Sequence, residues 1–249
     1  MQSLQFSSLR AYARTGGLLY FVLILVGMFA ELFVRGRLVV SGDAAATAHN
    51  LIAHQQLWQA GIVADLLMHL LDIPIMLVIF VLLRPVSKNI ALFALLFNIV
   101  QTAVLVANKL NLIAALLPLQ TAAYLKGVAL PSLYSQTYLS IRLHDIGFGV
   151  GLLFFGCTCL INGYLVRKSG YFPRTIGFLL QIAGICYLSS SFVLLLEPGF
   201  HNPLFPAIMI PCFVAELSFS LWLIFKGVDP VKWQQAAQQD ILDHFDQHM

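Results

Sequence analysis

Three ionisable side chains lie within one long apolar run. Of all residues in the chain, their types and spacing are the best suited to catalysis or ligand binding. Asp65, His69 and Asp72 fall within about 60° of one another on a helix that turns about 100° per residue. A charged residue in a membrane-spanning segment costs roughly 2.5–3.5 kcal/mol on insertion scales, so it normally faces a protein interior or a wet cavity. These three residues therefore mark the expected functional site.

The composition places this run in a membrane. Of the 249 residues, 59% are hydrophobic and 10% are charged, whereas about a quarter of the residues in a soluble domain are charged. Apolar runs that reach the ~20 residues of a spanning helix occur at about 16–34, 58–83, 90–117, 137–165, 175–196 and 206–225. We predict an all-α polytopic membrane protein: a single domain, 1–249, of six transmembrane helices, with short interfacial helices and a C-terminal tail helix.

The distribution of Lys and Arg predicts the orientation. One side of the predicted bundle carries Arg10, Arg14, Arg84, Lys88, Arg167, Lys168, Arg174, Lys226 and Lys232, and the other carries Arg35, Arg37 and Lys126. Positively charged loops stay in the cytoplasm, so both termini are expected there, in a bacterial inner membrane, with 35–56, 118–136 and 197–205 outside. This topology accounts for the net charge of +3, and no pattern indicates nucleic-acid binding.

Most other ionisable residues of the spans fall at one depth. Glu31, Lys109, Arg142, His144 and Asp145 lie with Asp65 and His69 in the outer half, and Asp72 and Glu216 lie near the middle. We therefore expect a polar cavity that opens outward. The prediction is that its carboxylates and histidines converge and that Arg142 and Lys109 compensate their charge.

One interpretation of this set is a metal-dependent, hydrolase-like enzyme. Imidazole and carboxylate ligands suit zinc or a comparable divalent metal, so His69, His144, Asp65 and Asp72 are the candidate ligands. Glu216 or Asp145 would serve as the catalytic base or support a ligand. The substrate would be a lipid or a small polar ligand that approaches from the outer side of the bilayer. The spacing Asp-x3-His-x2-Asp matches no specific metal signature.

Other interpretations remain open. Intramembrane carboxylates and histidines also serve proton-linked transport or sensing of small molecules. The lack of visible inverted repeats and the few polar residues of the inner half argue against a complete carrier. A bis-histidine haem at His69 and His144 is the least favoured hypothesis, because strong acids flank both residues. A structural or partner-binding protein with an ion-pair network needs the fewest assumptions.

Several stretches of the chain resemble a known family. The segments that carry the resemblance are 13–20, 42–54, 61–72, 83–87 and 168–174. They are similar to the bacterial membrane proteins grouped as domain of unknown function 4386. The resemblance implies a protein of the bacterial cytoplasmic membrane and implies no activity. The matching positions include His49 and His54, whose wide spacing otherwise favours solvated or interfacial side chains.

Overall fold

Helices make up the described structure almost entirely. The computed structural model describes residues 6–120, 126–197 and 205–246, and these parts of the chain contain no strand. The segments that are long and apolar enough to cross a membrane are Leu9–Leu38, Gln55–Leu83, Lys88–Leu119, Leu130–Lys168, Arg174–Leu196 and Ala207–Phe225. The predicted all-α bundle of six transmembrane helices is confirmed.

The first span is longer than its apolar run. Helix α1 (Phe6–Met28) continues through the π-helix η1 (Phe29–Arg35) into the short α2 (Gly36–Leu38). We expected this span to end near residue 34 and Arg35 to lie in an outer loop, and that expectation is wrong. The chain stays helical beyond Arg35, whose side chain is only 12% exposed.

A surface helix then leads into the second span, as predicted. Helix α3 (Ala44–Ala53) begins after Asp43, whose carboxylate accepts the backbone N–H of Ala46 at 2.8 Å. This bond satisfies one of the donors that the first turn of a helix leaves unpaired. Helix α4 (Gln55–Leu83) follows and runs without a break across Pro74.

The fourth span begins earlier in the sequence than we predicted. Helix α5 (Lys88–Ala114) is followed by a short 3-10 helix, η2 (Leu117–Leu119). Helix α6 (Leu130–Lys168) comes next along the chain. Its 39 residues measure about 58 Å at ~1.5 Å per residue, well beyond a hydrocarbon core of ~30 Å. The predicted outer loop 118–136 is therefore helical from residue 130.

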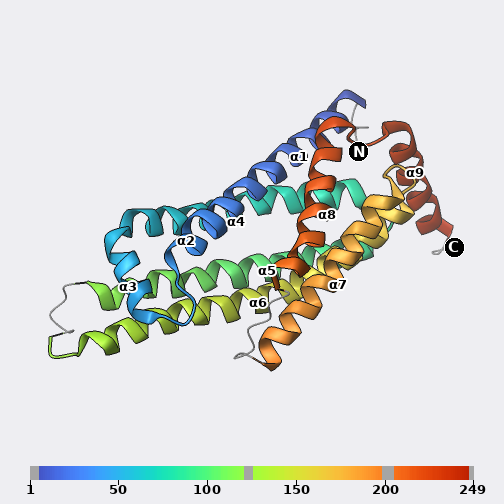
Figure 1. The fold of residues 1–249 in the computed structure, drawn as a ribbon. Coiled ribbons are helices and arrows are strands. Elements are labelled where there is room, and N and C mark those ends of the chain that lie inside the picture. Colours follow the sequence, from blue (N-terminus) through green and yellow to red (C-terminus); the bar gives the residue numbers. More distant parts are fainter. Residues whose placement is uncertain (1–5, 121–125, 198–204, 247–249) are drawn as a thin grey trace.

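The bundle brings the two ends of the chain together. Helices α7 (Arg174–Leu196), α8 (Phe205–Phe225) and α9 (Pro230–Asp246) complete the order. Figure 1 shows α1 beside α4 and α8, both termini at one end of the bundle, and α3 at the opposite end. Helix α6 packs against both α5 and α7, so every spanning helix has neighbours that can enclose a common interior.

Glycines on α6 allow this close packing. A Cβ atom on Gly151 would lie 2.4 Å from Leu105 of α5, and one on Gly147 would lie 2.1 Å from the Asn108 side-chain oxygen. The predicted small-residue pair Gly147-x3-Gly151 is thus a contact surface for α5. It brings the polar residues 108 and 109 of α5 next to His144 of α6.

Candidate functional site

The predicted cluster is divided into two polar centres. Asp65 and Asp72 do share one face of α4, but seven residues separate them by about 10 Å along the helix axis. Asp65 belongs to a set that we call the outer network, namely Glu31, Arg35, Asp65, Asn108, Lys109, Arg142, His144 and Asp145. Asp72 and Glu216 instead line a central cavity. The expected convergence on one site is therefore wrong.

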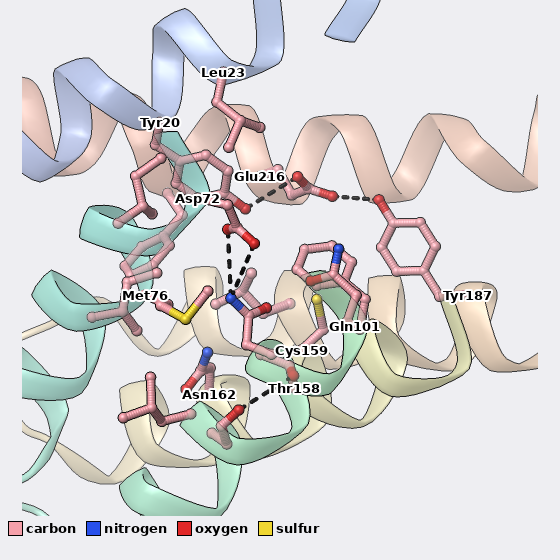
Figure 2. A pocket seen from close by; sticks show the side chains of 18 of the residues that line it. Tyr20, Leu23, Asp72, Met76, Gln101, Thr158, Cys159, Asn162, Tyr187 and Glu216 are labelled. Carbon is pink, nitrogen blue, oxygen red and sulfur yellow. Dashed lines mark hydrogen bonds between the residues drawn. The ribbon is translucent and has the colours of Figure 1, made fainter. Parts of the chain in front are cut away.

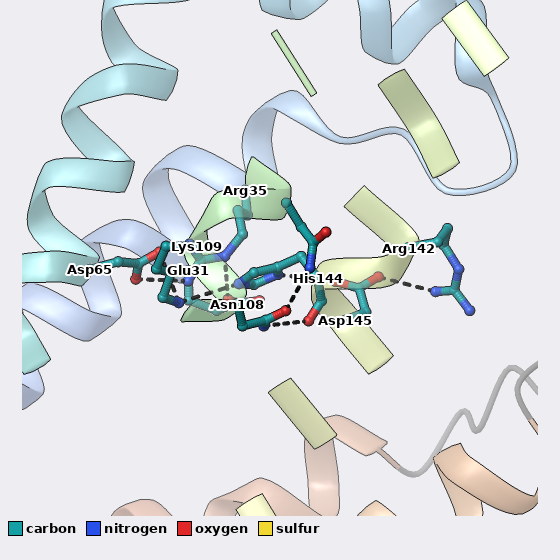
Figure 3. A network of polar contacts seen from close by, with 9 residues as sticks. Glu31, Arg35, Asp65, Asn108, Lys109, Arg142, His144 and Asp145 are labelled. Carbon is teal, nitrogen blue, oxygen red and sulfur yellow. Dashed lines mark hydrogen bonds and ion pairs between the residues drawn. The ribbon is translucent and has the colours of Figure 1, made fainter. Parts of the chain in front are cut away.

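Arg35 is the main partner of Asp65 in the outer network (Figure 3). Its guanidinium reaches one carboxylate oxygen of Asp65 at 2.5 Å and the other at 3.3 Å, and its Nε contacts Glu31 at 2.8 Å. The Asp65 side chain is 1% exposed, whereas that of Glu31 is 63% exposed. The forked guanidinium thus joins a buried carboxylate to a surface carboxylate.

Lys109 supplies the second positive charge. Its Nζ lies 3.3 Å from Asp65 and 3.2 Å from Nε2 of His144, and its side chain is 2% exposed. An ammonium group can only donate, so Nε2 of His144 is the acceptor in this contact. Asn108 holds the same part of α6 by donating to the His144 carbonyl at 2.8 Å. The predicted compensating role of Lys109 agrees with this geometry.

Arg142 and Asp145 form the outer edge of the network. They pair at 3.1 Å, one turn apart on α6, with side chains 31% and 40% exposed. Asp145 also lies 3.7 Å from Nδ1 of His144. Neither residue lines the central cavity, so Asp145 cannot share a catalytic role with Glu216 in this arrangement.

The predicted metal ligands do not form one coordination site. Among the described residues, no group of three or more His, Cys, Asp or Glu side chains is placed to hold a metal ion. The positive Lys109 ammonium stands between Asp65 and His144, where a divalent cation would be repelled. His69 and Asp72 line the central cavity, whereas the other two proposed ligands, Asp65 and His144, do not. The assignment of all four to one metal is therefore not supported by the geometry.

All six spanning helices contribute to the central cavity, which has a volume of about 190 Å³ (Figure 2). Its walls are mostly apolar and aromatic, with Phe80, Phe148, Phe155 and Phe219 among the lining residues. The polar side chains that line it come from all six helices: Tyr20, His69, Asp72, Asn98, Gln101, Thr158, Asn162, Tyr187 and Glu216.

Two tyrosines hold Glu216. The hydroxyl of Tyr20 on α1 donates to one carboxylate oxygen at 3.1 Å, and the hydroxyl of Tyr187 on α7 donates to the other. Figure 2 shows both phenols directed at the carboxylate from opposite sides. Glu216 on α8 is thereby held by α1 and α7 through neutral donors alone.

Asp72 is held in a similar way by α5. Thr102 donates its hydroxyl at 2.5 Å, and the amide of Asn98 lies 3.4 Å from both carboxylate oxygens. Among the described residues, neither Asp72 nor Glu216 forms an ion pair, and no Lys or Arg lines the cavity. His69 is its one basic side chain.

Three further polar atoms of the cavity lining have unused hydrogen-bonding capacity. Nε2 of His69, Oδ1 of Asn98 and Oε1 of Gln101 are buried without a protein hydrogen-bond partner in the described structure. These side chains are only 2%, 5% and 7% exposed. A buried polar atom without a partner costs about 1–3 kcal/mol, so a polar ligand or water that satisfied these atoms would be favoured.

Sequence reasoning missed three of the residues that matter most. Arg35 follows Glu31 by four residues, and this helical spacing could have shown that the first helix continues through it. Tyr20 and Tyr187 gave no signal, because a tyrosine in a span is ordinarily an interfacial or packing residue. His49 and His54 are exposed on or next to α3, and His49 contacts the ring of Tyr134, which agrees with the interfacial interpretation.

Comparisons with known proteins identify the family of this chain. Residues 15–227 match the family model described as Domain of unknown function (DUF4386). A protein of the archaeon Archaeoglobus fulgidus, described as an uncharacterized protein, is 32% identical over 166 residues, which cover 67% of this chain and 83% of the relative. No solved structure matches the chain. The six-helix membrane bundle characterised above is therefore a member of the DUF4386 family.

Proposed function

We propose that the protein binds a small protonated amine in the central cavity and exchanges it for a proton, as a step in transport or sensing. One observation carries this proposal: two half-buried carboxyl groups line the same cavity, and no cationic side chain is paired with either of them in the described structure. A carboxylate without a counter-charge at this depth is costly. A proton or a cationic ligand would supply the missing charge.

The other polar atoms of the cavity favour an ammonium group with N–H donors. The carboxyl oxygens of Asp72 and Glu216 and the free oxygens of Asn98 and Gln101 are all acceptors. An alkylammonium donates up to three hydrogen bonds and accepts none. The aromatic side chains around these groups would stabilise the cation through their ring faces.

The volume limits the ligand to a small one. An apolar cavity of roughly 150 Å³ accommodates benzene, so about 190 Å³ has room for a single ring or a short alkyl chain that bears an amine. Thr158 and Asn162 also line the cavity, and Asn162 belongs to the half of the bundle in which the sequence predicted only neutral polar residues. A polar lining that includes this half supports the transport alternative.

Benzylamine and benzyl alcohol provide a direct test, because they have nearly the same shape and differ in charge. Isothermal titration of the purified protein in lipid nanodiscs should show saturable binding of benzylamine or another primary amine of that size. Benzyl alcohol should bind at least tenfold more weakly. Binding in weakly buffered solution should release protons, which a pH indicator would record. A protein that binds no amine of this panel, or binds the alcohol equally well, would disprove the proposal.

Matched variants locate the binding to the cavity. Glu216→Gln and Asp72→Asn should each weaken amine binding at least tenfold and reduce proton release. Glu31→Gln, which changes a largely exposed carboxylate of the outer network, should leave both quantities unchanged. Amine-driven proton movement across proteoliposomes would then distinguish transport from sensing. Unaltered binding in both cavity variants would refute the assignment.

A further inference from the structure

A second hollow lies where the beginning of α1, the end of α8 and the segment before α9 meet. Figure 1 shows these segments at one end of the bundle. Its volume is about 450 Å³. It is lined by the beginning of α1, the α6–α7 connection, the end of α8 and the segment that leads into α9: Arg10, Arg14, Tyr171, Trp222, Phe225, Lys226, Gly227, Val228 and Asp229. The positive-inside pattern predicts that this end faces the cytoplasm.

The backbone around Gly227, which lines this hollow, is fixed by a tight turn and by hydrogen bonds. Gly227 has φ +65°, a left-handed conformation that glycine adopts without strain, and this turn ends α8. Its N–H donates to the Trp222 carbonyl at 2.9 Å, and its own carbonyl accepts the Trp222 indole N–H at 3.0 Å. Tyr171 is fixed by donating to the Leu82 carbonyl at 2.8 Å. Burial raises the pKa of the Tyr171 hydroxyl, so it remains a neutral donor.

The charge of the hollow is strongly positive. Arg10, Arg14 and Lys226 contribute three positive charges and Asp229 one negative charge, a balance of +2. One carboxylate oxygen of Asp229, Oδ1, accepts the backbone N–H of Val231 at 3.0 Å and that of Lys232 at 3.4 Å. The cations are exposed, and an anion that enters the hollow can reach them from one side.

Two aromatic side chains at the end of α8 lie close in sequence to Lys226. Phe225 is 70% exposed at the end of α8, and the partly buried Trp222 lies one turn before it. A ligand that suits this surface has an anionic head at the level of the arginines and apolar chains beside α8. Basic pockets at the ends of transmembrane helices bind phospholipid head groups by this combination.

We infer that this hollow is a specific site for the phosphate head group of an anionic phospholipid. The guanidinium groups of Arg10 and Arg14 and the ammonium of Lys226 contact the phosphate, and Phe225 packs against the first part of an acyl chain. The inference is independent of amine binding, since none of these residues lines the central cavity.

Native mass spectrometry of the full-length protein in dodecylmaltoside micelles tests this site. With phosphatidylglycerol and phosphatidylcholine supplied together, we expect preferential retention of one phosphatidylglycerol. The triple variant Arg10→Gln, Arg14→Gln, Lys226→Gln should lose that preference. Each cation removed should weaken phosphatidylglycerol binding about fivefold. Lys226→Glu alone should reduce retention more than Lys226→Gln does.

The matched control removes the same charge from the same end of the bundle. Lys88, Lys168 and Arg174 are exposed and do not line the hollow, so their triple substitution by Gln should leave phosphatidylglycerol retention unchanged. Equal losses in both triple variants would mean attraction to general surface charge and would overturn the site. If an equal concentration of inorganic phosphate displaces the lipid, the hollow binds free phosphate and the assignment to a phospholipid is wrong. Circular dichroism of each variant checks that the helices persist.

Discussion

The outer network and the central cavity contain the same kind of residue, a carboxyl group within a membrane helix, and stabilise it in opposite ways. Asp65 is surrounded by the cations of Arg35 and Lys109. Glu216 and Asp72 are held by hydroxyl and amide donors, without a positive partner among the described residues. The charge of Asp65 is compensated within the protein, whereas the carboxyl groups of the cavity have no compensating charge in the described structure.

This difference is the basis for proposing a structural role for one centre and a ligand-binding role for the other. A carboxylate that is already paired with two cations gains little from a further cation, and the network rigidifies the helices that it joins. The cavity keeps acceptors without partners, and these atoms gain hydrogen bonds when a ligand enters. Substitutions in the network should therefore act on stability, and substitutions in the cavity should act mainly on binding.

The largest effect is expected for Asp65→Asn. This change leaves the cations of Arg35 and Lys109 together in a buried position, and such a broken pair costs about 3–5 kcal/mol. The free energy of unfolding, measured by SDS titration in mixed micelles, should fall by that amount. Adding Lys109→Met should recover part of the loss. If the double variant is less stable than Asp65→Asn, Lys109 does not act through Asp65.

A smaller effect is expected for Tyr187→Phe in the cavity. The substitution removes one of the two hydroxyl donors to Glu216, and a carboxyl oxygen left without its donor costs about 1–3 kcal/mol. We expect a loss near the lower end of this range, because the hydroxyl of Tyr20 remains. The same SDS titration measures it, with Tyr164→Phe, on the exposed side of α6, as the control. Equal stability of the two variants would contradict the assigned contact.

Glu216→Gln should cost less than about 1 kcal/mol. The amide has the same shape as the carboxyl group, its oxygen still accepts one tyrosine hydroxyl, and no opposite charge is left unpaired. The contrast with Asp65→Asn in the same titration is the sharpest test of the difference between the two centres. A loss as large as that of Asp65→Asn would indicate a hidden cationic partner for Glu216.

The smallest effect belongs to Glu31→Gln. This carboxylate is 63% exposed and its pair with Arg35 spans one helical turn, an arrangement that contributes roughly 0.3–0.5 kcal/mol. Raising the salt concentration should make the variant and the wild type indistinguishable in stability. A loss above 1 kcal/mol would show that Glu31 is needed to orient Arg35 toward Asp65.

The fold class and the family could be predicted from the sequence because they depend on local properties. Six long apolar runs define six spanning helices, whatever their partners are. Asp65, His69 and Asp72 were predicted as site residues for a similar reason, since charge inside a span is unusual at the level of the single helix. Asp43 as a helix cap and the close packing at Gly147 and Gly151 also follow from short spacings.

Which charges meet could be decided only by the tertiary structure. Helical phase places Asp65 and Asp72 on one face, yet the axial rise directs them to different neighbours: Arg35 on the first span and Lys109 on α5 for Asp65, and Thr102 on α5 for Asp72. The tyrosine partners of Glu216 come from positions 196 and 29 residues away. Depth and pairing across helices are set by packing and register between elements, and no spacing within one helix encodes them.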